Sequence, residues 1–234
     1  MSHPAVAPST PSRPRTPGAG RLASCVLALL MAALAAGCGS APPTRYYLLA
    51  SPSVAAGAAA ETATRSAEGA SEERTAAGLR LGVETFAVDP PYDQNRVVFR
   101  IGEGSGEVGF YEQHRWAAPP GRLVATALAS GLRGLEGLSE VEPATVTGRY
   151  DLVLTGRVIC LEEIDLPDRQ LARLQLDLKL YRLSDETLLW SRLLSAETAG
   201  EAADASDIMR QMQTAFEQLL GELRGELARA VSSL

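Results

Sequence analysis

Histidine and cysteine, on which most metal sites and many catalytic sites depend, are scarce in this chain. Its 234 residues include two histidines, His3 and His114, and three cysteines. No cluster of Cys, Asp or Glu accompanies His114 at the spacing of a zinc site. A Gly-x-Ser-x-Gly elbow, which Ser-His-Asp chemistry with His114 as base would need, is also absent. We therefore expect no catalytic residue, no metal and no cofactor, and we expect a binding or scaffolding role instead of an enzyme.

Two other groups of residues suggest chemistry but are explained better by turns. Glu162 and Glu163 lie near Asp165 and Asp168, and paired carboxylates occur in glycoside hydrolases. Acids also favour turns and exposed positions, so we interpret these four as a turn beside solvated strand ends. The glycine-rich stretch 102–106 lacks the Lys-Ser or Lys-Thr of a phosphate loop and opens no helix. It predicts a hairpin turn.

No apolar run in the N-terminal third reaches the roughly 20 residues that a membrane-spanning helix needs. The stretch Leu22–Ala36 has 15 residues and follows Arg13, Arg15 and Arg21, which is typical of a signal peptide. It runs into Leu34-Ala35-Ala36-Gly37-Cys38, a lipobox in which small residues precede a cysteine that takes a diacylglycerol. The sequence therefore predicts a lipoprotein signal peptide over residues 1–37 and a lipid attached to Cys38.

Two alternatives to this cleavage site remain. Leu22-Ala23-Ser24-Cys25 matches the short lipobox pattern better, but cleavage there would leave no apolar segment upstream, so Cys25 is better explained as part of the apolar stretch. The other alternative is an ordinary secretory signal peptide, with a cysteine after Gly37 by chance.

The charge of the mature chain limits its partners. Removal of three arginines from 22 basic residues leaves 19 against 28 acids, a net charge of −9. This balance argues against nucleic acid and against electrostatic adhesion to anionic lipid headgroups. Anchoring is left to the acyl chains, of which more than one is needed for stable attachment. Gly39, not Asp, follows Cys38, which in a Gram-negative host predicts sorting to the outer membrane with the domain facing the periplasm.

Cys160 is the single cysteine left once Cys25 is removed and Cys38 is acylated. No intramolecular disulfide can then form, so the apolar core must provide the stability. Because Cys160 lies within the apolar run 152–161, we expect a buried, unreactive thiol.

Residues 38–78 differ in composition from the rest of the mature chain. The short run Tyr46–Leu49 predicts an edge strand. Residues 53–78 are mostly Ala, Glu, Ser, Thr and Gly, which indicates a flexible tether or an insertion. We therefore expect a lipidated N-terminus and tether over 38–78 and a folded domain over 79–234.

Hydrophobic periodicity within 79–234 predicts an α+β domain with two helices packed on a mainly antiparallel sheet. Alternation is clearest at Leu174, Leu176, Leu178 and Leu180. Strands are expected at 79–88, 96–101, 107–111, 150–165, around 174–180 and at 187–196. Helices are expected at 120–136, where Gly134 and Gly137 mark the end, and at 204–234, with one apolar stripe facing the core.

Several phrases of the sequence together resemble a known family. The lipobox is followed by Tyr-Tyr-Leu-Leu at 46–49, Pro-Pro-Tyr at 90–92, Arg96 with Arg100, and His-Arg-Trp-Ala at 114–117; a Leu-rich hairpin and a final helix complete the pattern. Over most of residues 44 to 231 this resembles the ABC-type transport auxiliary lipoproteins, a group that includes the lipoprotein partner of paraquat-inducible intermembrane transport systems. The stretch 53–78 departs from the compact spacing expected for the group.

The resemblance implies a non-catalytic, periplasm-facing subunit. It would dock the substrate-carrying MCE-domain protein of an ATP-driven lipid transporter, whose permease and ATPase are separate chains. The residues before the first helix then become candidates for partner binding: Tyr92, Arg96, Tyr111 and Trp116. The alternative for Trp116 is a place in the core. Two other functions stay open: a lipoprotein that carries a phospholipid itself, and an accessory lipoprotein of an outer-membrane assembly.

Overall fold

The computed structural model describes residues 42–50, 78–104, 106–200 and 205–234. Over these residues the chain forms a nine-stranded mixed sheet and two helices, α3 (Pro120–Leu132) and α4 (Ala205–Ser232). The predicted α+β class, with two helices on a sheet, is confirmed. The predicted signal peptide, Cys38 and residues 51–77 of the expected tether lie outside the described residues. No helix within the described ranges is both long and apolar enough to cross a bilayer.

The strands differ greatly in length. In chain order they are β1 (Arg45–Tyr47), β2 (Leu79–Val83), β3 (Ala87–Val88), β4 (Arg96–Ile101), β5 (Val108–Trp116), β6 (Leu138–Pro143), β7 (Leu152–Asp165), β8 (Gln170–Arg182) and β9 (Thr187–Gly200). Antiparallel ladders join β7 to β8, β8 to β9 and β4 to β5. Shorter parallel ladders join β1 to β5, β2 to β6, and β7 to β2, β3 and β4. The expected antiparallel pairing thus holds for the longest strands.

β7 is the strand around which the sheet is built. One of its edges pairs with β8 from Leu152 to Asp165. Along the other edge, β2 pairs with 152–154, β3 with 157–158 and β4 with 162–165. β6 extends the sheet beyond β2, while β5 and then β1 extend it beyond β4. The order of the whole sheet therefore depends on one 14-residue strand.

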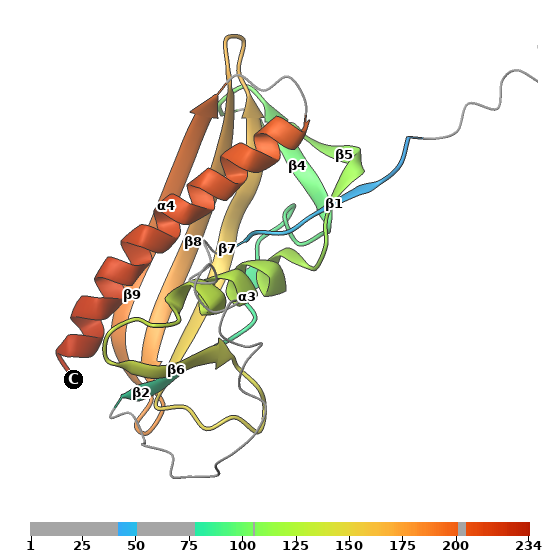
Figure 1. Ribbon diagram of the computed structural model, residues 1–234. Helices are drawn as coiled ribbons and strands as arrows, with labels where there is room; N and C mark the ends of the chain where they lie inside the picture. Colours follow the sequence, from blue (N-terminus) through green and yellow to red (C-terminus); the bar gives the residue numbers. More distant parts are fainter. Residues whose placement is uncertain (1–41, 51–77, 105, 201–204) are drawn as a thin grey trace, which may run out of the picture. The chain divides into compact units, whose positions relative to one another are not determined.

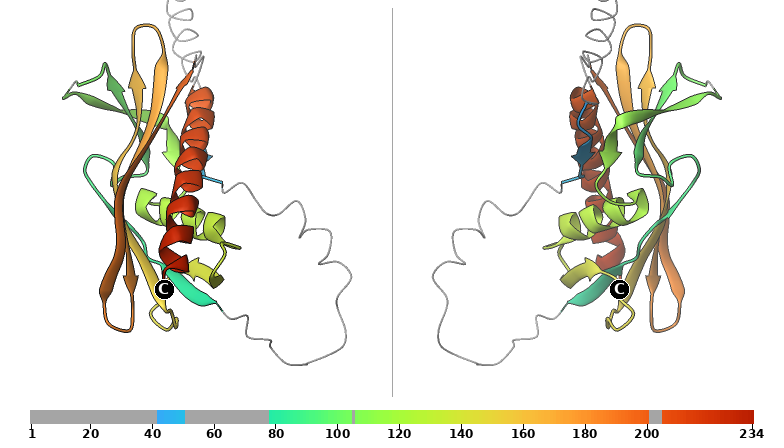
Figure 2. Two further views of the ribbon diagram at one scale, coloured as in Figure 1. Left: turned by 90° about the vertical axis from the view of Figure 1, so that its left-hand side faces the viewer. Right: turned by 90° about the vertical axis from the view of Figure 1, so that its right-hand side faces the viewer.

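Both helices cover the same face of the sheet, which we call the inner face (Figure 1, Figure 2). α4 lies lengthwise over β8 and β9, and α3 packs beside it over β2 and β6. The predicted core-facing stripe of α4 is confirmed, because all its members are at most 8% exposed: Ile208, Met212, Phe216, Leu219, Leu220, Leu223, Leu227 and Val231. The four alternating leucines of β8 are fully buried beneath it. Burial of each such leucine contributes about 1.5–3 kcal/mol to the stability of the folded state.

Several elements differ from the prediction, among them β5, which was expected at 107–111 and extends to Trp116. α3 ends at Leu132, earlier than expected, because Arg133 leaves helical geometry and Gly134 takes a positive φ of 73°. The expected strand 79–88 is divided into β2 and β3. β6 was not predicted, since only Leu138 and Val141 of its six residues are large and apolar and its pairing partner, β2, is distant in sequence.

Of the short strand predicted near Tyr46–Leu49, Tyr46 and Tyr47 lie in β1 (Arg45–Tyr47), an edge strand of the sheet, whereas Leu48 and Leu49 lie beyond its end. β1 runs parallel to β5, with Arg45 opposite His114 and Tyr47 opposite Trp116. The Ala117 N–H then donates to the Tyr47 carbonyl at 2.8 Å. β1 therefore joins two stretches of chain about 70 residues apart.

Residues 48–50 continue from β1 into the space between α3 and α4 (Figure 1). Leu49 enters the core and is 7% exposed, whereas Leu48 faces outward and is 70% exposed. The Ala50 N–H donates to Gln213 Oε1 of α4 at 2.9 Å, and Gln213 Nε2 donates back to the Ala50 carbonyl. Arg45 also donates to Ser206 at the start of α4. We call residues 45–50 the N-terminal clasp.

Truncation of the two neighbouring leucines of the clasp should affect stability to very different extents. In a soluble form with Cys38 replaced by Ser, we expect Leu49→Ala to lower the free energy of unfolding by about 2–3 kcal/mol, because it leaves a cavity in the core. Leu48→Ala, the matched control, should change it by less than about 0.5 kcal/mol. Urea unfolding measures both. Equal effects would mean that the clasp is not packed as described.

Candidate functional site

The four residues predicted to bind a partner all lie in or near β4 and β5, but in different surroundings. Trp116 is 2% exposed and belongs to the main core, which was the alternative given for this residue in the sequence analysis. Tyr92 is 6% exposed and belongs to a second, smaller core with Val98 and Cys160. Arg96 and Tyr111 are half-buried. Among the four, Arg96 and Tyr111 thus have the more accessible side chains, and their binding to a partner stays a prediction.

Arg96 lies against an aromatic ring on the β4–β5 hairpin. Its guanidinium carbon is 4.9 Å from the centre of the Phe110 ring, and its Nε donates to Gln94 Oε1 at 3.2 Å. Stacking of this kind holds a guanidinium in place while leaving it partly exposed. Phe110 in turn packs with Val108 against the smaller core. The hairpin thus presents an Arg and an aromatic side chain in a fixed arrangement.

Beside this hairpin, on the neighbouring strand β7, lies a buried carboxylate, Glu162, which is 3% exposed. It accepts a hydrogen bond from the Tyr92 hydroxyl at 2.6 Å and from Arg100 Nη2 at 3.1 Å. Arg173 of β8 completes the charge balance, with Nη1 3.9 Å from Glu162 Oε1. Burial, and then the hydrogen bond to Glu162, raise the pKa of Tyr92 well above its usual range. The tyrosine therefore remains a neutral donor.

The next residue, Glu163, points to the opposite face of the sheet because side chains alternate along a strand. It is 2% exposed and accepts a hydrogen bond from the Tyr111 hydroxyl at 2.6 Å. Burial raises the pKa of Glu163, the Tyr111 hydrogen bond opposes this rise, and the charge of Asp165 adds to it. Tyr111 also contacts the rings of Phe99 and His114, at 5.1 and 5.4 Å between centres.

The interpretation of Glu162 and Glu163 as solvated residues beside a turn is therefore wrong, although Asp165 and Asp168 are exposed as expected. Both glutamates lie within β7, and their partners allow them to be buried: Tyr92, Arg100 and Arg173 for Glu162, and Tyr111 for Glu163. The prediction missed this because these partners are distant in sequence. A sequence signal did exist, since two successive acids interrupt an otherwise apolar strand. Each carboxylate fastens the β4–β5 hairpin to β7 on one face of the sheet.

Two of the phrases on which the resemblance was based meet in space. Tyr-Tyr of β1 pairs in register with the Arg-Trp of β5. Tyr47 stacks on His114 with ring centres 5.6 Å apart, and its hydroxyl lies 2.7 Å from His114 Nδ1. His114, for which the sequence analysis expected no catalytic role, thus helps to hold the N-terminal clasp.

The described residues contain no group of three His, Cys, Asp or Glu side chains that could hold a metal ion. Cys160 is a buried thiol as expected. Its burial, and to a lesser degree the charge of Glu162, raise its pKa to about 12.

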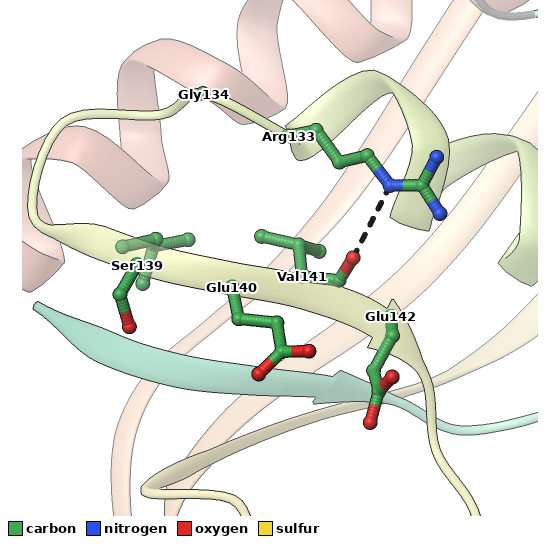
Figure 3. A pocket seen from close by; sticks show the side chains of 7 residues that line it. Arg133, Gly134, Ser139, Glu140, Val141 and Glu142 are labelled. Carbon is green, nitrogen blue, oxygen red and sulfur yellow. Dashed lines mark hydrogen bonds between the residues drawn. The ribbon is translucent and has the colours of Figure 1, made fainter. Parts of the chain in front are cut away.

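A cavity of about 340 Å³ lies between the end of α3 and β6 (Figure 3). Its acids are engaged: Glu140 pairs with Arg80 at 2.8 Å, and Glu142 accepts from the Tyr150 hydroxyl at 2.9 Å. Arg133 Nε donates to the Val141 carbonyl there.

Removal of the buried charge at Glu162 should cost far more stability than removal of an exposed one. Glu162→Gln takes away the carboxylate that Arg100 and Arg173 surround, and we expect a loss of roughly 3 kcal/mol in the free energy of unfolding. Glu140→Gln, which breaks an exposed Arg–Glu pair, should cost less than about 1 kcal/mol. Similar losses in the two variants, measured by urea unfolding, would contradict the proposed role of Glu162.

The raised pKa of Glu163 predicts a specific dependence of stability on pH. Because its folded pKa exceeds the unfolded value of about 4.3, the folded state binds more protons between the two, and this group adds stability as the pH falls. Glu163→Gln should remove this pH-dependent contribution, while the amide oxygen of Gln can still accept the hydrogen bond from the Tyr111 hydroxyl. The variant should therefore gain most stability relative to the original chain near pH 7, with the difference shrinking as the pH falls toward the unfolded pKa of about 4.3. A difference independent of pH in urea unfolding would refute this.

Comparison with solved structures supports the fold. A protein from Xanthomonas campestris is similar over 67% of this chain and 87% of its own, with 19% identity and a TM-score of 0.59. A protein described as uncharacterized is similar over 80% of this chain and 99% of its own, with 15% identity and a TM-score of 0.57. A lipoprotein from Neisseria meningitidis, at 14% identity, covers 67% of this chain and 99% of its own, but its TM-score of 0.33 carries no argument.

Identities this low show a shared fold alone. No curated protein matches the chain. A model of the family described as ABC-type transport auxiliary lipoprotein component, in contrast, matches residues 60–223. This match extends over 164 of the 234 residues and includes β2 to β9 with both buried glutamates. The chain therefore belongs to the family of ABC-type transport auxiliary lipoprotein components.

Proposed function

We propose that this chain is a lipid-anchored, non-catalytic subunit of an ABC-type, MCE-linked intermembrane transport system for lipids or other hydrophobic compounds. Its role is to dock the substrate-carrying MCE-domain protein, whose permease and ATPase are separate chains. Family membership is the observation that carries the proposal. Cys38 bears the lipid, and the domain faces the periplasm from the outer membrane. The lipobox and Gly39 support this placement.

The packing between the helices and the sheet favours docking over lipid carriage. A carrier would need apolar space between α4 and the sheet to hold an acyl chain. That space is filled by side chains of α4 and β8, among them Phe216, Leu223 and Leu176, each 0% exposed. A lipid there would have to displace a close-packed core.

The face that we propose for docking is the side of the β4–β5 hairpin that carries Arg96 and Phe110. The hairpin extends away from the rest of the sheet (Figure 2). Ile101 at its end is 63% exposed, and Arg with aromatic side chains is the composition enriched in binding hot spots. The hydrogen bonds of Arg100 to Glu162 and of Tyr111 to Glu163 fix the hairpin to β7. A rigid contact surface of this kind loses less entropy on binding.

Affinity capture of the acylated protein from crosslinked native membranes tests the proposal. We expect mass spectrometry to recover an MCE-domain protein with its permease and ATPase. Arg96→Ala should reduce recovery of the partner about tenfold or more if the hairpin is the hot spot. Arg192→Ala, a matched loss of an exposed arginine on β9, should leave recovery unchanged.

Each failure has a distinct meaning. Stoichiometric phospholipid recovered without transporter chains would contradict docking and support the carrier function. Recovery of the transporter with no effect of Arg96→Ala would keep the subunit function and refute the hairpin as its contact surface.

A further inference from the structure

The order in which the chain enters the sheet determines how far the domain can lie from its anchor. From Cys38 the chain passes through seven residue steps to Arg45, the first residue of β1. Residues 51–77 come only afterwards, between the N-terminal clasp and β2. They are therefore not part of the connection between the lipid and the folded domain. Composition left open whether residues 53–78 are a tether or an insertion, and the place of β1 in the sheet favours the insertion.

The reach of this connection follows from covalent geometry. A fully extended chain spans at most about 3.3–3.6 Å per residue, so seven steps cover at most about 25 Å. A folded unit of about 160–190 residues has a radius of gyration near 16 Å, hence a diameter of roughly 40 Å. The connection is thus shorter than the domain itself. The domain cannot turn over freely, and the surface that contains β1 must stay near the bilayer.

The side chains of the clasp suit that position. Successive residues of an extended chain point to opposite sides. Tyr47 and Leu49 face the protein, while Tyr46 and Leu48 are 67% and 70% exposed on the other side. Two hollows flank Leu48, one of about 410 Å³ against α3 that includes Arg122, and one of about 430 Å³ against α4 that includes Arg210 and Glu217.

Tyrosine and leucine beside arginine are residues that bind at the boundary between acyl chains and phosphate headgroups. We propose that the exposed side of the N-terminal clasp, Tyr46 and Leu48, rests on the headgroup region of the bilayer that holds the lipid of Cys38. This inference depends on the lipid anchor of the proposed function. The contact is short-range and apolar, so the net negative charge of the mature chain does not oppose it on a largely zwitterionic surface. The subunit then works at its own membrane, and the substrate-carrying partner must come to it.

A fluorescence-quenching experiment in proteoliposomes tests this contact. The acylated chain with Cys160→Ala carries a bimane at Leu48→Cys, in vesicles made mainly of phosphatidylethanolamine, with a minor share of phosphatidylglycerol and a lipid that bears a nitroxide near its headgroup. The matched control carries the bimane at Leu193→Cys, since Leu193 of β9 is similarly exposed, at 60%. We expect loss of most of the fluorescence at position 48 and little loss at position 193.

Two matched insertions test whether the short connection is the cause. A Gly/Ser segment of about 20 residues between Ala41 and Pro42 adds a root-mean-square reach of about 25 Å, and it should remove most of the difference between the two positions. The same segment between Ala59 and Ala60 lies after the clasp and should leave the difference intact. Equal effects of the two insertions would overturn the inference.

The outcomes separate this inference from the proposed function. Protein that does not float with the vesicles refutes the lipid anchor itself. Protein that floats, with equal quenching at positions 48 and 193, refutes the contact between the clasp and the headgroups but not the lipid anchor. Absence of quenching at position 48, together with loss of partner capture in Leu48→Ala, would assign this surface to a protein and likewise overturn the inference.

Discussion

The insertion of Leu49 and the pairing of β1 with β5 determine how this domain is closed and how it is attached. α3 and α4 cover different parts of the sheet and touch each other little, so the gap between them needs a third element. The N-terminal clasp fills it, with Leu49 in the core and Ala50 held by Gln213 of α4. Since the clasp also begins seven residue steps from Cys38, the same packing sets the distance between the domain and the lipid anchor that we propose at Cys38.

The C-terminal end of β7 depends on a different interaction. There, two successive glutamates point to opposite faces and hold the β4–β5 hairpin through Tyr92 with Arg100 and through Tyr111. Such buried charges cost desolvation energy, and an apolar core could be as stable. Their value is directional, because hydrogen bonds from defined tyrosines fix the orientation of the hairpin. This explains how the contact surface that we propose on the hairpin can be rigid without a large core beside it.

Sequence periodicity predicted the elements whose pattern is local. Three elements were recognisable from local sequence: β8 by its alternation at 174–180, β7 by its long apolar-rich run, and α4 by its apolar stripe. What depends on distant partners was not recognisable. β6 has two large apolar residues and is a strand because β2 lies beside it. The burial of Glu162 needs Arg100 and Arg173, 62 and 11 positions away, and periodicity carries no information about such pairs. For Tyr92, Arg96, Tyr111 and Trp116, the sequence identified their neighbourhood but not which side chains are buried.

Hydrogen exchange of the acylated protein, followed by mass spectrometry, tests most directly the claim that the N-terminal clasp is part of the domain. The account predicts that amides of residues 45–50 exchange slowly, with protection similar to that of β5, to which β1 is paired. Exchange over 45–50 at the rate of an unstructured peptide, while β7, β8 and α4 stay protected, would contradict it. The connection to Cys38 would then be long, and the domain would be free to move away from its membrane.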